Sequence, residues 1–260
     1  MRAILGIDAA WTLTEPSGVA LIVERDGQWH LEAVSPSYAH FISDEAGRHR
    51  PRGSAVSANL LLEEAARRIG QAIDLVAIDM PLSQRPIISR RLSDNLVSSA
   101  YGARHGGTHS PSAVRPGAIS DRLRRDLGTL GYPLLTAAID QPGTIEVYPH
   151  PALIELLKAE KRLPYKTSKV RNYWRDDPPG IRRERLLGVW NDIVGALDQE
   201  VADTHKMLSV PAYNAIGWQM KAFEDMLDAV ICAWVGACAL DGKATPFGDQ
   251  ESAIWIPGSN

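Results

Sequence analysis

The chain has 260 residues, of which 45% are hydrophobic and 23% are charged, and its formal net charge at pH 7 is −3. This composition is typical of a globular protein with one large core, and no Gly/Ser-rich or Pro-rich linker divides the chain, so we predict a single domain over residues 1–260. The slightly negative charge excludes an overall positive field that would attract nucleic acid, so such a partner would require a local basic patch. No feature of the sequence indicates an oligomeric state.

The two cysteines and the N-terminal segment indicate a cytoplasmic location. Cys232 and Cys238 lie in an apolar stretch, where a thiol behaves as a small buried hydrophobic group, and their spacing does not suit a metal ion. The chain begins with an apolar strand pattern and lacks the charged, apolar and cleavage-site regions of a signal peptide. No apolar run reaches the length that spans a membrane. We therefore expect a protein of the reducing cytoplasm that has no membrane contact.

The first third of the chain predicts three consecutive strands, a helix and a fourth strand. Residues 3–10 form a short apolar run with Asp8 near its end, as in a buried strand whose carboxyl end meets solvent. An Asp26-Gly27 turn joins the next two strands. The expected elements are strands over 3–10, 19–23 and 29–34, a helix over 54–73 with Ser54 or Ser57 as its N-cap, and a strand over 75–79 that ends in Asp79.

The remainder begins with a long irregular segment and then alternates helices with strands. Residues 83–120 are rich in Arg, Ser, Gly, Pro and His with weak periodicity, which predicts a long loop or insertion that acts as a lid or is merely mobile. The expected elements that follow are a helix over 119–131, a strand over 144–148, helices over 152–159, 181–202 and 221–240, and a short strand over 253–256. This order predicts an α/β fold with a mixed central sheet, a three-strand meander followed by parallel strands, flanked by helices.

Acidic residues recur where the predicted strands end. Asp8 ends the first strand, Asp79 ends the fourth, and Glu146 lies in the fifth. Asp225 and Asp228 are three residues apart in an otherwise apolar helix, so they share one face of it. A buried acid costs several kcal/mol to ionise unless it has a partner or a metal ion.

Hard oxygen ligands that converge from strand ends and one helix suit Mg²⁺ or Mn²⁺, which we expect as the cofactor. Two such ions about 3.5–4 Å apart would activate a water and stabilise the leaving oxygen of a phosphodiester. Each acid taken singly can instead be structural, because Asp and Glu often end strands or cap turns. Asp225 is the weakest candidate, since Glu224 beside it indicates a partly solvated turn, whereas Asp228 is enclosed by apolar neighbours.

Five short segments, in order along nearly the whole chain, carry a family resemblance. They are Gly6-Ile7-Asp8-Ala9-Ala10-Trp11, Pro16-Ser17-Gly18-Val19-Ala20, Ala77-Ile78-Asp79-Met80-Pro81-Leu82, Ile145-Glu146-Val147-Tyr148-Pro149-His150-Pro151 and Asp225-Met226-Leu227-Asp228-Ala229-Val230. Together they resemble the predicted RNase H-like nucleases known as domain of unknown function 429. The resemblance implies an RNase H-like fold, in which acids on the first strand, the fourth strand and a late helix bind metal for strand cleavage. Asp8, Asp79 and Asp228 occupy those positions.

Two further acids extend the predicted site. Glu146 joins Asp8, Asp79 and Asp228 as a catalytic candidate because of the resemblance and its strand position, although the acids usual in RNase H-like enzymes do not include it. The pair Asp225 and Asp228 also resembles the closing acidic pair of Holliday-junction resolvases. We therefore predict Asp8, Asp79, Asp225 and Asp228 as metal ligands.

Aromatic and basic residues supply candidate substrate contacts. Trp11, next to Asp8, could stack a nucleobase or could pack under the neighbouring loop. His150, between two prolines, could shuttle protons or bind metal, or could be hydrogen-bonded within a turn. Five basic residues could contact phosphate or simply be solvated: Arg104, His105, His109, Arg115 and Lys166. Of all these residues, we predict Trp11, Arg115 and Lys166 as substrate-binding.

The sequence is compatible with two functions from different classes. The first is a divalent-metal-dependent nuclease that hydrolyses phosphodiester bonds in DNA or RNA through the carboxylate cluster. The second is a non-catalytic RNase H-like binding or regulatory protein that uses the acidic pocket for a small ligand or a macromolecule. The absence of Gly-x-x-x-x-Gly-Lys-[Ser/Thr] and Gly-x-Ser-x-Gly patterns argues against a P-loop nucleotide hydrolase and a serine hydrolase.

Overall fold

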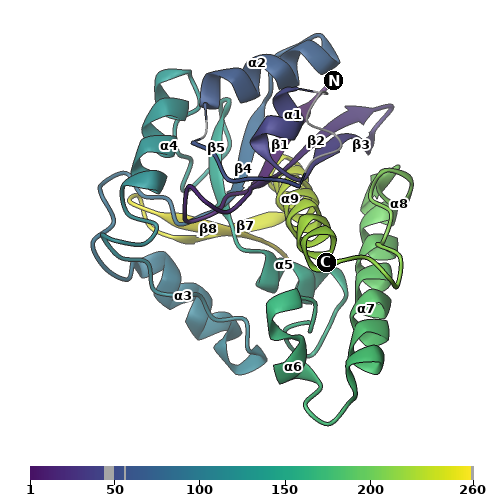
Figure 1. Ribbon diagram of the computed structural model, residues 1–260. Helices are drawn as coiled ribbons and strands as arrows, with labels where there is room; N and C mark the ends of the chain where they lie inside the picture. Colours follow the sequence, from purple (N-terminus) through teal and green to yellow (C-terminus); the bar gives the residue numbers. More distant parts are fainter. Residues whose placement is uncertain (44–49, 56, 259–260) are drawn as a thin grey trace.

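The structure, a computed structural model, describes residues 1–43, 50–55 and 57–258. In this part of the chain a curled eight-stranded mixed sheet is flanked by helices (Figure 1), which confirms the predicted α/β class with a mixed central sheet. The strand order is β6-β3-β2-β1-β4-β5-β8-β7. The strands are β1 (Ala3–Asp8), β2 (Gly18–Arg25), β3 (Gln28–Ser35), β4 (Leu75–Asp79), β5 (Gly143–Val147), β6 (Val201–Ala202), β7 (Ala244–Gly248) and β8 (Ala253–Pro257).

The meander and the parallel strands that follow it form the two halves of the sheet. β1 pairs antiparallel with β2, which pairs antiparallel with β3, while β4, β5 and β8 continue from β1 in parallel. Asp26 and Gly27 both have positive φ angles, 51° and 79°, as a two-residue hairpin that matches the twist of its strands requires. The central strands β1 and β4 are apolar up to the acid that ends each of them, because helices cover both faces of the sheet.

Helices lie on both faces of the sheet, and within the described residues none has the length and apolarity needed to cross a membrane. On one face, Leu61 and Leu123 from two helices pack with Leu5 and Val76 of the strands. The helical elements are α1 (Tyr38–Ile42), α2 (Ala58–Ile69), α3 (Leu92–Tyr101), η2 (Gly102–Arg104), α4 (Ala118–Thr129), α5 (Pro149–Leu156), η3 (Thr167–Lys169), α6 (Val170–Tyr173), α7 (Pro179–Glu200), α8 (Thr204–Met207) and α9 (Gly217–Leu240). Ser57 is the N-cap of α2, as predicted, and its hydroxyl accepts a hydrogen bond from the Leu60 N–H.

The other face is covered by α9, α7 and α5 (Figure 1). Gly6 of β1 lies so close to α9 that a Cβ atom at this position would be 2.2 Å from the Ala229 carbonyl oxygen. Only a residue without a side chain permits this approach. The close contact brings the middle of α9 directly against the central strands, where β1 and β4 end.

Several predicted elements differ from the structure, three of them for a clear physical reason. Residues 83–120 are not loop throughout, since α3 and η2 lie within them and Val97 and Tyr101 pack against the β8 residue Ile254. The helix expected from residue 152 begins at Pro149, because proline is tolerated in the first turn of a helix. The edge strand β7 was not predicted, since its Ala-Thr-Pro-Phe-Gly sequence contains a proline, which only an edge strand readily accepts.

Candidate functional site

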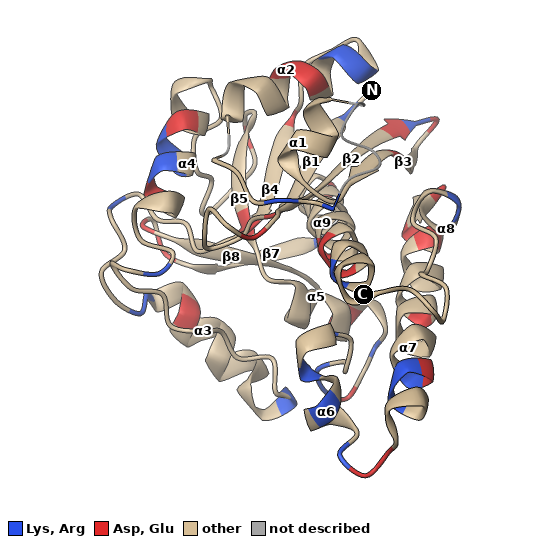
Figure 2. Cartoon of the chain, viewed as in Figure 1, with Lys and Arg blue, Asp and Glu red and all other residues tan. Residues whose placement is uncertain are grey.

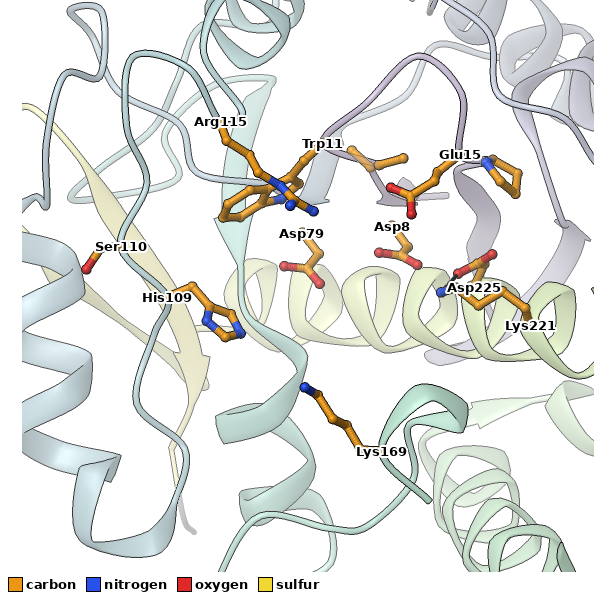
Figure 3. A pocket seen from close by; sticks show the side chains of 13 residues that line it. Asp8, Trp11, Glu15, Asp79, His109, Ser110, Arg115, Lys169, Lys221 and Asp225 are labelled. Carbon is orange, nitrogen blue, oxygen red and sulfur yellow. Dashed lines mark hydrogen bonds and ion pairs between the residues drawn. The ribbon is translucent and has the colours of Figure 1, made fainter. Parts of the chain in front are cut away.

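Asp8 and Asp79 are direct neighbours in the sheet. They are register partners on the parallel strands β1 and β4, and each is the last residue of its strand. Figure 3 shows both carboxylates on the same side, above α9 and facing an open cleft. The cleft has a volume of about 650 Å³ and is lined by Asp8, Ala9, Ala10, Trp11, Glu15, Pro16, Asp79, His109, Ser110, Arg115, Lys169, Lys221 and Asp225.

The environment of these two carboxylates disfavours their charged forms. Burial and then the charge of Asp228 raise the pKa of Asp79 to about 7 and raise the pKa of Asp8 well above its ordinary value. Lys166 offsets this effect only in part. In the described residues, neither carboxylate has a side-chain hydrogen bond or an ion pair, so this acid pair lacks a direct protein partner.

Asp228, in contrast, is fully partnered. It is completely buried in α9, where the Tyr165 hydroxyl donates a 2.8 Å hydrogen bond to Oδ1 and the Lys166 ammonium pairs with Oδ2. The Lys166 ammonium also lies 3.7 Å from a carboxylate oxygen of Glu224. Although burial opposes it, the Asp228 charge holds the pKa of Lys166 well above its ordinary value. Lys166, predicted to contact substrate, therefore faces the acids of α9.

Asp225 and Glu224 are buried in the middle of α9, so the partly solvated turn expected there is wrong. Lys221 pairs with Asp225 Oδ1 and lies 3.1 Å from a carboxylate oxygen of Glu224. Glu224 also accepts hydrogen bonds from the Thr167 N–H (2.6 Å) and hydroxyl (2.7 Å). Asp225 Oδ2 is buried and has no hydrogen-bond partner, and burial raises the pKa of Asp225 to about 6.

Glu146 is held in a separate buried ion pair. The Arg91 guanidinium donates to both of its carboxylate oxygens, at 2.7 Å to Oε1, and the Leu82 N–H donates at 2.7 Å to Oε2. Arg91 also pairs with Asp94 at 2.8 Å. Glu146 borders a small cavity of about 40 Å³ that Asp79 also lines, and it does not line the main cleft. Glu146 thus lies outside the main cleft, and its carboxylate is paired with Arg91.

Charged residues are distributed unequally around the cleft. Figure 2 shows acidic residues in α9 beneath the strand ends and basic residues in the neighbouring α6 region. Arg115 lies over the Trp11 ring, 5.8 Å from its centroid, so two of the three residues predicted to bind substrate border the cleft. Lys169 and Lys221, which were not predicted, also line the cleft. Lys169 ends η3 and Lys221 lies near the start of α9, and an exposed lysine gives no signal that periodicity can detect.

Two other sequence candidates lie away from the cleft. Arg104 pairs with Glu155 at 2.8 Å and lines a different hollow. His150 is buried between the rings of Tyr148 and Tyr165, with ring centroids 5.3 and 5.4 Å away. Burial keeps the pKa of His150 well below its ordinary value, so its imidazole is neutral.

The acids of the cleft are the residues that could hold a divalent cation. In the described part of the chain, no three His, Cys, Asp or Glu side chains are arranged to hold a metal ion, and Lys166 and Lys221 pair with Asp228 and Asp225. Mg²⁺ commonly keeps several waters and takes only one or two protein carboxylates, together with substrate phosphates. The unpaired Asp8 and Asp79 carboxylates, beside the unpartnered oxygen of Asp225, fit that requirement.

Fold and site together define an α/β protein with an acidic cleft at the carboxyl ends of two parallel strands. The chain belongs to the family described as Protein of unknown function (DUF429), whose profile matches residues 6–253. No curated protein and no solved structure matches the chain. The match confirms the predicted membership in the family of unknown function 429 but carries no activity, so an RNase H-like nuclease function has to be argued from the site.

Proposed function

We propose that the protein is a divalent-metal-dependent nuclease with an RNase H-like arrangement. The observation that carries this proposal is the pair of unpartnered carboxylates, Asp8 and Asp79, on neighbouring strand ends in an open cleft. The three-strand meander followed by parallel strands is the sheet that the RNase H-like resemblance leads one to expect. Because both cysteines are free and buried, we place this activity in the reducing cytoplasm.

In this proposal the acids divide into two groups with different roles. Asp8 and Asp79 hold the ion, with the free oxygen of Asp225 available to it or to its waters. Bound Mg²⁺ or Mn²⁺ supplies charge stabilisation for the phosphodiester and for the attacking water. Asp228 pairs with Lys166 and accepts the Tyr165 hydrogen bond, and so positions both residues below the cleft. Arg115 and Trp11 provide a cation and an aromatic face on the substrate side.

The test is cleavage of labelled single-stranded DNA, duplex DNA, RNA and hybrid oligonucleotides with Mg²⁺, with Mn²⁺ and with EDTA. We expect Asp8→Asn and Asp79→Asn to reduce cleavage by roughly 100-fold or more, since metal binding contributes several kcal/mol to such reactions. Asp192→Asn, which changes an exposed acid on α7, is the matched control and should cleave like the parent. Thermal unfolding of each variant verifies that it is folded.

A non-catalytic binding protein is the second candidate, and one observation favours it. Lys166 and Lys221 already neutralise part of the α9 acids, as they would in a pocket built to bind a ligand without metal. If the folded parent protein cleaves no oligonucleotide with either metal but binds oligonucleotides in EDTA, this second function replaces the nuclease.

A further inference from the structure

The side of the cleft opposite the acids is basic. Figure 3 shows Arg115, His109 and Lys169 pointing into the space beside Asp79 from different segments of the chain. Arg115 and His109 lie between α3 and α4, and Lys169 ends η3. In the described residues, none of these three cationic or titratable side chains has an acidic partner within ion-pair distance.

A fourth basic residue, Arg162, is close enough to the cleft for its charge to act on His109, which lines it. It is half-buried, its Nε atom is buried without a hydrogen-bond partner, and its guanidinium has no ion pair in the part of the chain that is described. Burial and then the charges of Arg162, Lys169 and Arg115 lower the pKa of His109. His109, Arg115 and Lys169 line the same cleft, and Arg162 lies close enough for its charge to act on the His109 imidazole.

Such a cluster is electrostatically costly by itself, because like charges repel and no carboxylate in the described part of the chain forms an ion pair with them. An anion placed among these side chains would relieve the repulsion. The acids at Asp8 and Asp79 lie on the other side of the same cleft. The cleft is thus bipolar, with one side suited to a metal ion and the other to phosphate oxygens.

We propose that His109, Arg115, Arg162 and Lys169 form a phosphate-binding subsite for a phosphate of the substrate adjacent to the one that is hydrolysed. This inference rests on the proposed nuclease function and specifies its substrate as a nucleic acid with at least two phosphates. Trp11 lines the same cleft under Arg115, and the base of the nucleoside whose sugar links the two phosphates would stack on it.

The subsite is tested by binding in EDTA, where no cleavage occurs. The probes are thymidine oligonucleotides of two, three and six nucleotides, each with and without a 5′-phosphate, with their affinity measured by calorimetry at several salt concentrations. We expect Lys169→Gln and Arg162→Gln each to weaken binding about tenfold, as the loss of a charge-assisted hydrogen bond does, and to reduce the salt dependence by about one phosphate contact. Lys206→Gln removes the same charge from an exposed site on α8 and serves as the control.

The outcomes separate this inference from the nuclease proposal. Weakened binding in both cleft variants supports the subsite even if the parent protein cleaves nothing. A loss confined to 5′-phosphorylated probes identifies a terminal phosphate as the ligand, whereas equal losses for both probe sets identify an internal one. The subsite is overturned if Lys169→Gln and Arg162→Gln bind the probes as tightly as the parent protein or the Lys206→Gln control. It is also overturned if the parent protein does not bind the probes, even where cleavage is observed. Should Arg162→Gln not fold, the exposed Arg115→Gln variant replaces it.

Discussion

Gly18 lies directly against the backbone of Asp225, so that a Cβ atom on Gly18 would be 2.0 Å from the Asp225 carbonyl oxygen. Gly18 is also the register partner of Asp8 across the β1–β2 pair. The glycine therefore fixes the distance between the strand that carries Asp8 and the helix that carries Asp225. This contact between backbones, in which no side chain takes part, brings Asp225 of α9 close to Asp8 of β1.

Gly18→Ala is expected to displace α9 from β2, because backbone atoms cannot yield to the new methyl group as a flexible side chain can. We expect the free energy of unfolding to fall by about 1–3 kcal/mol, the usual cost of overpacking a core, and Mg²⁺ affinity to fall with it. Thermal unfolding and calorimetry measure both quantities. Gly188→Ala, at a position of α7 with open space around its Cα, is the control and should be neutral or stabilising. Parent-like behaviour of Gly18→Ala would show that α9 can adjust without loss.

Metal affinity is expected to increase as the pH rises from about 5.5 to 8. The pKa of Asp79 is raised to about 7, that of Asp225 to about 6 and that of Asp8 well above its ordinary value, so these acids are mostly protonated at the lower end of this range. Because a metal ion binds the carboxylate form, its binding must release protons there and must become independent of pH only once all three acids are ionised. Calorimetry of Mn²⁺ binding in buffers with different ionisation enthalpies counts these protons. A Mn²⁺ affinity that does not change over this pH range would contradict the raised pKa values of these acids.

Lys166→Met should make the stability of the protein depend on divalent cations. The substitution leaves the buried carboxylate of Asp228 without its ammonium partner, and breaking one side of a buried ion pair costs about 3–5 kcal/mol. A divalent ion that binds nearby would compensate part of that charge, so Mg²⁺ should raise the melting temperature of the variant more than that of the parent. Lys206→Met, an exposed lysine on α8, should show the parent response to Mg²⁺. Equal Mg²⁺ responses in all three proteins would place the ion outside the range of Asp228.

Arg91→Met is expected to destabilise the protein by about 3–5 kcal/mol, because it leaves the buried Glu146 carboxylate uncompensated. Arg25→Met removes the exposed partner of Glu32 and should cost less than about 1 kcal/mol. Urea unfolding compares the two variants.

Urea unfolding and the cleavage assay together decide the role predicted for Glu146. A Glu146→Gln variant with parent stability and no cleavage would support catalysis, whereas instability with parent-like cleavage by the folded fraction would support a structural role.

The central strands and the positions of the main acids were predictable because the signals are local. β4 lies over the predicted residues 75–79, and β1 ends at Asp8, since each strand is a continuous apolar run that an acid terminates. The α9 helix was recognisable from its apolar length, and the positions of Asp225 and Asp228 within it follow from helical spacing. Residues 92–101 escaped prediction because α3 buries only a narrow stripe against β7 and β8, so its apolar periodicity is weak.

The partners of the acids were not predictable, since they come from distant parts of the chain. Glu146 pairs with Arg91, 55 residues away, and Asp228 pairs with Lys166, 62 residues away. No local pattern encodes such contacts, because they depend on which segments pack together across the sheet.

The sequence by itself determined which acids end the strands and share a helix face, because periodicity and apolar runs fix those positions locally. Only the tertiary structure decided which acids are neutralised and which remain without a partner. Packing brings Arg91 to Glu146 and Lys166 to Asp228, and it leaves Asp8 and Asp79 side by side at the cleft. The physical reason is that a buried carboxylate is compensated by whichever cation the fold places within a few ångströms, and that distance is a property of the packed chain.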